Sequence, residues 1–182
     1  MAVTQGSLRS SVRVEPEEFS RRAAARLGEA ATEHQILHGQ AWIRVSANRL
    51  VDVVSTLHSD PELACDYLTF LSAVDWQQDG FELVVVLYST VNEATIGVKV
   101  RLAAEGPSVP SITSVFGGAG WHERECAEMF GIHFEGHPNL KNLYLPDDFE
   151  GHPLRKDFRL ASRAFKPWPG AKDPDEAAGG GR

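Results

Sequence analysis

The chain has 182 residues, of which 42% are hydrophobic, and a formal net charge of −7. This length predicts one domain with a tail, large enough to bury a core of its own. The acidic balance argues against nucleic acid as a partner, because phosphate binding requires a basic patch and the sequence shows none. No apolar run approaches the ~20 residues of a membrane-spanning helix, so we expect no direct membrane span.

The N-terminal half favours an α+β fold, with helices packed on a mainly antiparallel sheet. Helices are expected at 16–30, where Pro16 stands in the first turn, and at 48–58, where Asn48 serves as the cap. Strands rich in β-branched and aromatic residues are expected at 41–45, 67–76, 81–89 and 95–102. Residues 77–80 supply the turn chemistry of a hairpin between the second and third of these strands.

The two cysteines, Cys65 and Cys126, lie far apart in the sequence. Their number excludes a disulfide-rich secreted module and an iron–sulfur cluster ligated by this chain alone, which needs about four thiolates. A single disulfide stays open as an alternative. Two buried, unreactive thiols are the favoured interpretation.

The sequence divides into five parts. We expect a disordered N-terminus at 1–14, an α+β domain at 15–104, a loop and charged helix at 105–131, an extended partner-binding segment at 132–158 and a C-terminal tail at 159–182. The charged helix should open at Gly118 or Gly120 and end near Phe130, with Gly131 as its left-handed cap. Beyond Gly131 neither a helical nor a strand period appears, so this segment should be extended, rich in turns and unable to fold on itself.

The charged helix supports two interpretations. Trp121, Glu125 and Glu128 share one side of it. A solvated face is the plain interpretation, because exposed charges usually contribute little to stability. The sharper hypothesis is that Glu123, Arg124 and Glu125 meet arginine and carboxylate groups of another protein, where bidentate pairing has geometric value.

The pentapeptide Phe-Glu-Gly-His-Pro occurs twice, at 134–138 and 149–153. Gly permits a sharp turn and Pro forces the preceding His toward extended geometry, so each copy should form a kink that presents one imidazole. We favour histidines that hold turns through backbone hydrogen bonds over metal ligands. Asp147 and Asp148 point to opposite faces of an extended chain, so they are better explained as turn residues than as an acid/base pair.

No glycine-rich dinucleotide motif, Walker-type loop or serine nucleophile elbow is present in the sequence. The chain therefore offers no nucleotide site and no catalytic nucleophile. A different kind of function is also considered: a free-standing metal-dependent hydrolase that uses His133, His137, His152 and Asp147. That hypothesis predicts stoichiometric metal in the purified chain.

Residues 121–158 carry two blocks with a specific spacing. The first block consists of Glu123-Arg124-Glu125, Glu128, Met129-Phe130, His137 and Lys141, and the second is Leu145-Pro146-Asp147-Asp148-Phe149-Glu150-Gly151-His152-Pro153-Leu154-Arg155-Lys156-Asp157-Phe158. Together they closely resemble the C subunit of the proton-pumping NADH:quinone oxidoreductase, respiratory complex I. The departures are small: Glu128 replaces a common Asp, Phe149 a common Trp and Gly120 a common Asn.

The resemblance implies a structural and assembly subunit in the peripheral arm, on the cytoplasmic side of the cell membrane, without a cofactor or catalytic site of its own. In that family, flavin and iron–sulfur clusters in partner chains carry electrons from NADH to quinone, coupled to proton translocation. The implied partners are the large quinone-site subunit, known as the D subunit, and neighbouring iron–sulfur subunits. The residues expected to bind partners are Trp121, Glu123, Arg124, Glu125, Glu128, His137, Lys141, His152, Arg155, Lys156 and Asp157.

An alternative close to this resemblance is the equivalent subunit of a related membrane-bound hydrogenase complex. There the domain is often fused to a large nickel-binding subunit, whereas this sequence has no CxxC pair. We therefore expect this chain to stand alone and to carry no nickel ligands. The KPWPG motif at 166–170 is similar to that of bacterial members, and an actinobacterial source is the finer expectation.

Overall fold

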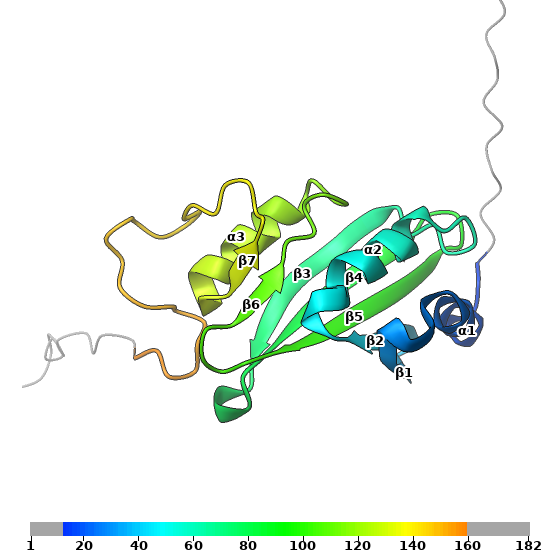
Figure 1. Ribbon diagram of the computed structural model, residues 1–182, viewed down its shortest axis with the longest axis horizontal. Helices are drawn as coiled ribbons and strands as arrows, with labels where there is room; N and C mark the ends of the chain where they lie inside the picture. The colour runs from blue at the N-terminus through cyan, green and yellow to red at the C-terminus, as the bar shows by residue number, and fades with distance from the viewer. Residues whose placement is uncertain (1–12, 160–182) are drawn as a thin grey trace, which may run out of the picture.

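The computed structural model describes residues 13–159. A five-stranded sheet in the order β1-β2-β5-β4-β3 forms the centre of the fold (Figure 1). Its strands are β1 (Ala31–Leu37), β2 (Gln40–Val45), β3 (Tyr67–Asp75), β4 (Phe81–Ser89) and β5 (Ala94–Leu102). Neighbouring strands run antiparallel except β2 and β5, which are parallel. The prediction of an α+β fold with a mainly antiparallel sheet is confirmed.

Two helices, α1 (Pro16–Leu27) and α2 (Leu50–Ser59), lie on the near face of the sheet in Figure 1. Alternate residues of the central strands, such as Leu87 and Val98, are fully buried, and so is Phe19 of α1. The core therefore lies between this face and the two helices, as period-two strands and amphipathic helices require. No helix in residues 13–159 has the length and apolar character to cross a bilayer.

Three features of the N-terminal half differ from the sequence expectations. The first helix ends at Leu27, and a 3₁₀ turn follows from Gly28, whose φ is +52°. Asn48 does not cap α2: it lies in a 3₁₀ turn (Ala47–Arg49), where its side-chain oxygen accepts a hydrogen bond from Ser46 Oγ. Strand β1 was not expected, because all of its residues after Ala31 are exposed and so provide no apolar period to detect.

The C-terminal half contains the helix α3 (Ala119–Phe130) and a parallel pair of short strands, β6 (Ser108–Pro110) and β7 (His133–Glu135). Gly131 ends α3 with φ 72° and ψ 30°, and its N–H binds the carbonyl of Ala127, which confirms the expected left-handed cap. Helix α3 packs against β3, and its buried side chains join the same core cluster as the sheet.

Both cysteines are free and buried, in agreement with the favoured interpretation. Burial raises the pKa of each thiol to about 12, so neither Cys65 nor Cys126 is a reactive thiolate at neutral pH. Most of the expected N-terminal disorder and of the expected tail, including the motif at 166–170, lies outside the described residues. The division of the chain into five parts stays a prediction.

Candidate functional site

Residues 132–158, which we call the docked segment, run alongside α3 in Figure 1. The segment packs on α3 of its own chain: side chains of α3 bind its backbone, and its own side chains bind the backbone of α3. Each such bond satisfies a backbone group in a region with almost no regular structure of its own. The predicted site residues provide most of these bonds.

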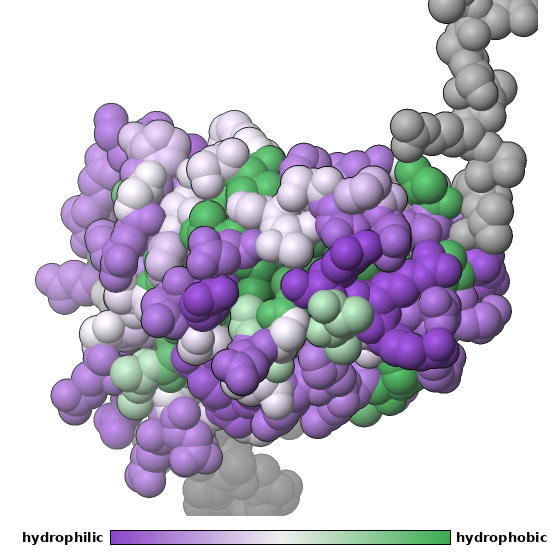
Figure 2. All heavy atoms as spheres, turned by 45° about the vertical axis from the view of Figure 1, so that its right-hand side comes forward, coloured by the Kyte–Doolittle hydropathy of each residue, from purple (hydrophilic) through white to green (hydrophobic). Residues whose placement is uncertain are grey.

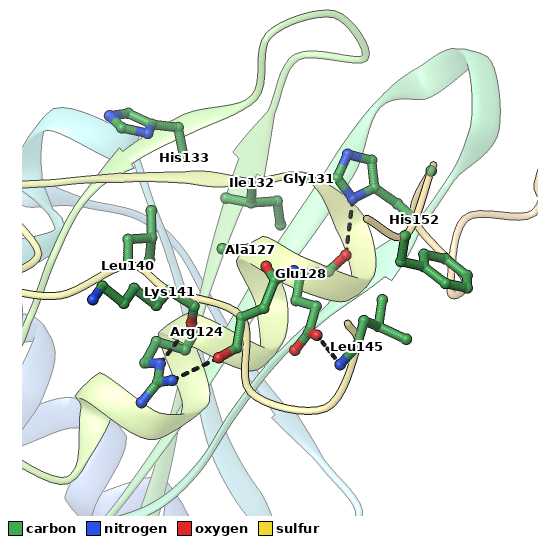
Figure 3. A pocket seen from close by; sticks show the side chains of 13 residues that line it. Arg124, Ala127, Glu128, Gly131, Ile132, His133, Leu140, Lys141, Leu145 and His152 are labelled. Carbon is green, nitrogen blue, oxygen red and sulfur yellow. Dashed lines mark hydrogen bonds between the residues drawn. The ribbon is translucent and has the colours of Figure 1, made fainter. Parts of the chain in front are cut away.

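Glu128 holds one turn of the docked segment. Its carboxylate accepts N–H groups from Leu143 at 3.0 Å, from Tyr144 at 3.0 Å and from Leu145, the last of which is drawn in Figure 3. Burial acts to raise the pKa of Glu128, but the hydrogen bonds from these three amides outweigh it and lower the pKa. The ionised carboxylate therefore fixes three consecutive residues to α3.

Arg124 holds the neighbouring turn. Its Nε donates to the carbonyl of Lys141 at 2.7 Å and its Nη2 donates to that of Asn142 at 2.8 Å (Figure 3). The guanidinium also lies 5.3 Å from the centre of the Trp121 ring. Arg124 was expected to meet a partner protein, but two of its donors, Nε and Nη2, bind carbonyls of its own chain. Trp121 remains 61% exposed.

Glu123 is fully buried, although the sequence placed it at an interface. Its carboxylate accepts hydrogen bonds from Ser111 Oγ at 2.6 Å and from the Ile112 amide at 2.8 Å. Burial raises its pKa, and the two hydrogen bonds and nearby His137 oppose that shift without cancelling it. Glu123 therefore ties α3 to the chain that follows β6, and its carboxylate faces residues of its own chain rather than a partner.

The two histidines of the repeated pentapeptide hold backbone turns, as the sequence predicted. His137 Nδ1 accepts the Asn139 amide at 3.0 Å, which assigns the ring proton to Nε2, 3.1 Å from the carbonyl of Gly120. His152 Nδ1 lies 2.8 Å from the carbonyl of Glu128 and donates to it. Within the described part of the chain, no group of three or more His, Cys, Asp or Glu residues is placed to hold a metal ion.

The end of the docked segment is fixed to the ends of α3 and β3. Arg155 Nε donates to the carbonyl of Phe130 at 2.6 Å, and the amide of Lys156 donates to Asp75 Oδ2 at 2.7 Å. Gly131 makes this possible, because a Cβ there would lie 2.5 Å from Arg155 Nη2 and from His152 Nε2. The side chains of Lys156 and Asp157 are exposed.

The structure thus gathers the predicted residues around one helix but gives them two roles. Six of them anchor backbone or buried groups: Glu123, Arg124, Glu128, His137, His152 and Arg155. The partner role of the whole set stays a prediction. Sequence reasoning missed Ser111 and Asp75, because single polar residues far from their partners in sequence leave no local pattern.

A pocket of about 320 Å³ lies between α3 and the docked segment (Figure 3). Glu128, Arg124, Lys141, His133 and His152 are among the residues that line it. Three of these side chains, Glu128, Arg124 and His152, already bind backbone groups, which suits a structural role better than activation of a substrate.

Ten large apolar side chains are exposed in residues 13–159, and all but two of them lie on one group of elements. The two exceptions are Ile36 and Leu37 of β1. The other eight belong to β3 and the residue after it, to α3 and to the docked segment: Tyr67, Phe70, Val74, Trp76, Trp121, Tyr144, Phe149 and Leu154. The face shown in Figure 2 mixes hydrophilic and hydrophobic residues.

Comparison with known families gives a match to most of the chain. A model of the family "Respiratory-chain NADH dehydrogenase, 30 Kd subunit" matches residues 43–164. The C subunit of NADH-quinone oxidoreductase from Roseiflexus sp. (strain RS-1) is 42% identical over 143 residues, which cover 78% of this chain and 82% of the relative. The same protein from Brucella abortus (strain 2308) is 42% identical over 137 residues, covering 74% of this chain and 67% of the relative.

Two solved structures share the fold. A trypsin-resistant fragment (1–134) of Nqo5 aligns with a TM-score of 0.57 and 24% identity, covering 68% of this chain and 98% of the fragment. A chain of the membrane-bound sulfane sulfur reductase, an archaeal respiratory membrane complex, aligns with a TM-score of 0.66 and 24% identity. This second alignment covers 80% of the present chain and 86% of the other.

Proposed function

This chain belongs to the family of the 30 kDa subunit of respiratory-chain NADH dehydrogenase, and we propose that it serves as a structural and assembly subunit. It is a component of the peripheral arm of NADH-quinone oxidoreductase, complex I, which passes electrons from NADH to quinone and couples this to proton translocation. The chemistry belongs to the complex, and this chain contributes shape and contacts rather than a catalytic group.

The observation that carries this proposal is the arrangement of β3, α3 and the docked segment. Their polar side chains hold the backbone, and eight large apolar side chains stay exposed. Exposed apolar residues gathered on adjoining elements are typical of a protein interface. We propose that this side of the molecule packs against the quinone-site subunit and neighbouring iron–sulfur subunits, with Trp121 and Glu125 among the contact residues.

We place the flavin and iron–sulfur clusters of the pathway in those partner subunits. The whole sequence contains two cysteines, fewer than the about four thiolates of a cysteine-ligated cluster. The chain would occupy the cytoplasmic side of the cell membrane as a peripheral subunit. Its relatives are bacterial, and an actinobacterial source stays a prediction that depends on the motif at 166–170.

The second candidate is the equivalent subunit of a related membrane-bound hydrogenase complex. The observation in its favour is the fold shared with a chain of the sulfane sulfur reductase at a TM-score of 0.66. That likeness has 24% identity, whereas the similarity to the C subunit of NADH-quinone oxidoreductase reaches 42%. The complex I assignment is therefore the better supported of the two.

The test is affinity purification of the tagged full-length chain from solubilised host membranes, with identification of its partners and an NADH:quinone activity assay. We expect recovery with NADH-oxidising, iron–sulfur and membrane subunits. Recovery with hydrogenase subunits would favour the second candidate. Recovery of the chain alone from the soluble fraction, with bound metal, would overturn the proposal and revive the hydrolase hypothesis.

A pair of variants tests which side of the molecule forms the interface. Trp121→Ala should reduce the recovered complex several-fold, because exposed tryptophans in interfaces contribute strongly to binding. Leu37→Ala removes an exposed apolar side chain from β1 and should leave the recovery unchanged. Equal recovery of the two variants would place the interface elsewhere.

A further inference from the structure

The pocket between α3 and the docked segment has a positive lining in an acidic protein. Arg124 and Lys141 line it together with His133 and His152 (Figure 3), whereas the whole chain has a net charge of −7. Glu128 is the one acidic residue of this lining, and both of its oxygens already accept amide hydrogens from 143–145. Glu128 keeps its negative charge, but its oxygens are occupied by these amides, and the two cations Arg124 and Lys141 leave the lining with a net positive charge.

Neither cation of the pocket forms an ion pair within the described residues. Arg124 donates from Nε and Nη2 to carbonyl oxygens, and the ammonium group of Lys141 makes no hydrogen bond or ion pair to residues 13–159. Elsewhere on the surface, cations have acidic partners: Arg21 lies 2.8 Å from Glu18, and Arg26 lies 2.8 Å from Glu62. The charge of Arg124 acts on nearby Glu128 and helps to lower its pKa, so Lys141 is the cation of this pocket that has no acidic partner within residues 13–159.

The shape and composition of the pocket suit a carboxylate on a short apolar stem. Ala127, Ile132 and Leu140 provide apolar lining that methylene groups can contact. The Nε of Arg124 donates to the backbone carbonyl of Lys141, so the guanidinium lies beside the residue that carries the ammonium side chain. The ammonium group of Lys141, which lines the same pocket, suits a carboxylate, because hydrogen bonds between charged groups are stronger than neutral ones.

The surroundings of the pocket indicate that the carboxylate comes from a protein. Phe149 lines the pocket, and Trp121 lies against Arg124; both are exposed large apolar residues. A free anion gains nothing from such neighbours, whereas a protein surface that presents an acidic side chain would cover them at the same time.

We propose that this pocket receives an Asp or Glu side chain of an adjacent subunit of the assembled complex. The inference rests on the proposed function, because it requires a neighbouring subunit. Arg124 holds the docked segment and contributes positive charge, and Lys141 supplies the direct ion pair. The pocket thereby fixes the orientation of the chain on its partner, as complementary charges do at interfaces.

The first test compares charge reversals in the tagged full-length chain, purified as the intact complex. Lys141→Glu should lower the recovered complex at least about ten-fold, because it places a carboxylate against the partner's carboxylate. Arg21→Glu reverses a cation on α1 and should change recovery less than about two-fold, since exposed ion pairs contribute little. Lys141→Arg keeps the charge and should assemble as the unmodified chain does.

The second test identifies the partner group. A zero-length carbodiimide joins an amine to a carboxylate in contact with it, and mass spectrometry of the treated complex should find Lys141 linked to an Asp or Glu of another subunit. Lys141→Arg should abolish this link without loss of the complex. Thermal unfolding of the purified full-length chain should be the same for Lys141→Glu and the unmodified protein, which excludes a folding defect.

The outcomes separate this inference from the proposed function. Equal recovery of Lys141→Glu and Arg21→Glu overturns the inference, and so does a complex in which Lys141 is unlinked or linked only within its own chain. In both cases the unmodified chain still copurifies with the complex, and the proposed function holds. If the unmodified chain recovers no complex, both proposals fail.

Discussion

The sheet with its two helices and the docked segment are held together by different forces. In the first region, side chains such as Phe19, Leu87 and Val98 are completely buried. In the docked segment, only Ile132 and Phe134 near its start are buried, and no residue from 139 to 159 is. The core depends on apolar burial, while the docked segment depends on hydrogen bonds from a few polar side chains to the backbone.

The sheet and its helices supply the stability of the fold, whereas the docked segment keeps side chains exposed that a partner protein can contact. Because no residue from 139 to 159 is buried, this part of the docked segment gains little from the hydrophobic effect and should open more easily than the sheet does. Because its backbone is fixed by Glu128, Arg124 and His152, its apolar side chains need not turn inward. The same arrangement that weakens the segment leaves Tyr144 and Leu154 free for another protein.

The largest expected effect is the loss of a core side chain. Leu87→Ala should lower the free energy of unfolding by about 2–5 kcal/mol, because it leaves a cavity at a fully buried site. Leu154→Ala removes the same group from the docked segment, where the side chain is 51% exposed, and should cost less than about 0.5 kcal/mol. Denaturant unfolding of the full-length chain measures both, and similar losses would contradict the comparison.

The next effect concerns the docked segment alone. Glu128→Ala leaves the amides of Leu143, Tyr144 and Leu145 without their acceptor, which should weaken local structure by about 1–3 kcal/mol. Hydrogen exchange should accelerate at these three amides and stay unchanged in β4 and β5. Glu125→Ala, on the same helix, is the matched control. If exchange at the same three amides accelerated equally in Glu125→Ala, Glu128 would have no special role.

The elements that the sequence predicted well are those with a local signal. Strand β4 is rich in β-branched and aromatic residues, β5 alternates apolar residues, and α3 ends at a glycine that can adopt a left-handed cap. The role of His137 and His152 was also accessible, because each stands between a glycine and a proline. These signals depend on residues within a few positions of one another.

The features that were missed depend on residues far apart in the sequence. The contact of the Lys156 amide with Asp75 spans 81 positions, and no periodicity connects the two. Glu123 was taken for a surface residue because carboxylates are rarely buried without a partner. Its partners, Ser111 Oγ and the amide of Ile112, become adjacent to it only once the chain before α3 has folded back.

Gly131, at the end of α3, and Gly136, in the docked segment, allow the cost of backbone strain to be compared with the cost of a packing clash. Gly131 and Gly136 have similar φ values, +72° and +78°, so an alanine at either should cost about 1–2 kcal/mol in strain. Only at Gly131 would the new Cβ also meet Arg155 and His152. Gly131→Ala should therefore be the more destabilising in thermal unfolding and should release residues 152–156 to proteolysis. If the two alanine variants lost the same thermal stability, the close packing of Arg155 and His152 on Gly131 would contribute nothing to the stability of the fold.

The smallest effects are expected from pH, and they should differ in sign between two carboxylates of the same helix. The pKa of Glu128 is lowered, so its contribution to stability is present above the ordinary glutamate pKa and is lost as pH falls through the folded value. The pKa of Glu123 is raised, so its contribution is present below the ordinary value and is lost as pH rises through the folded one.

Acidification should therefore loosen the docked segment while it strengthens the junction between α3 and the chain after β6. Amide exchange, corrected for its intrinsic pH dependence, should rise at 143–145 and fall at Ile112 as pH is lowered through the carboxylate range. Glu128→Gln should flatten the first response and Glu123→Gln the second. Both carboxylates are buried and accept backbone amides, but burial dominates at Glu123 and hydrogen bonds dominate at Glu128, so a parallel change at both places would contradict this difference.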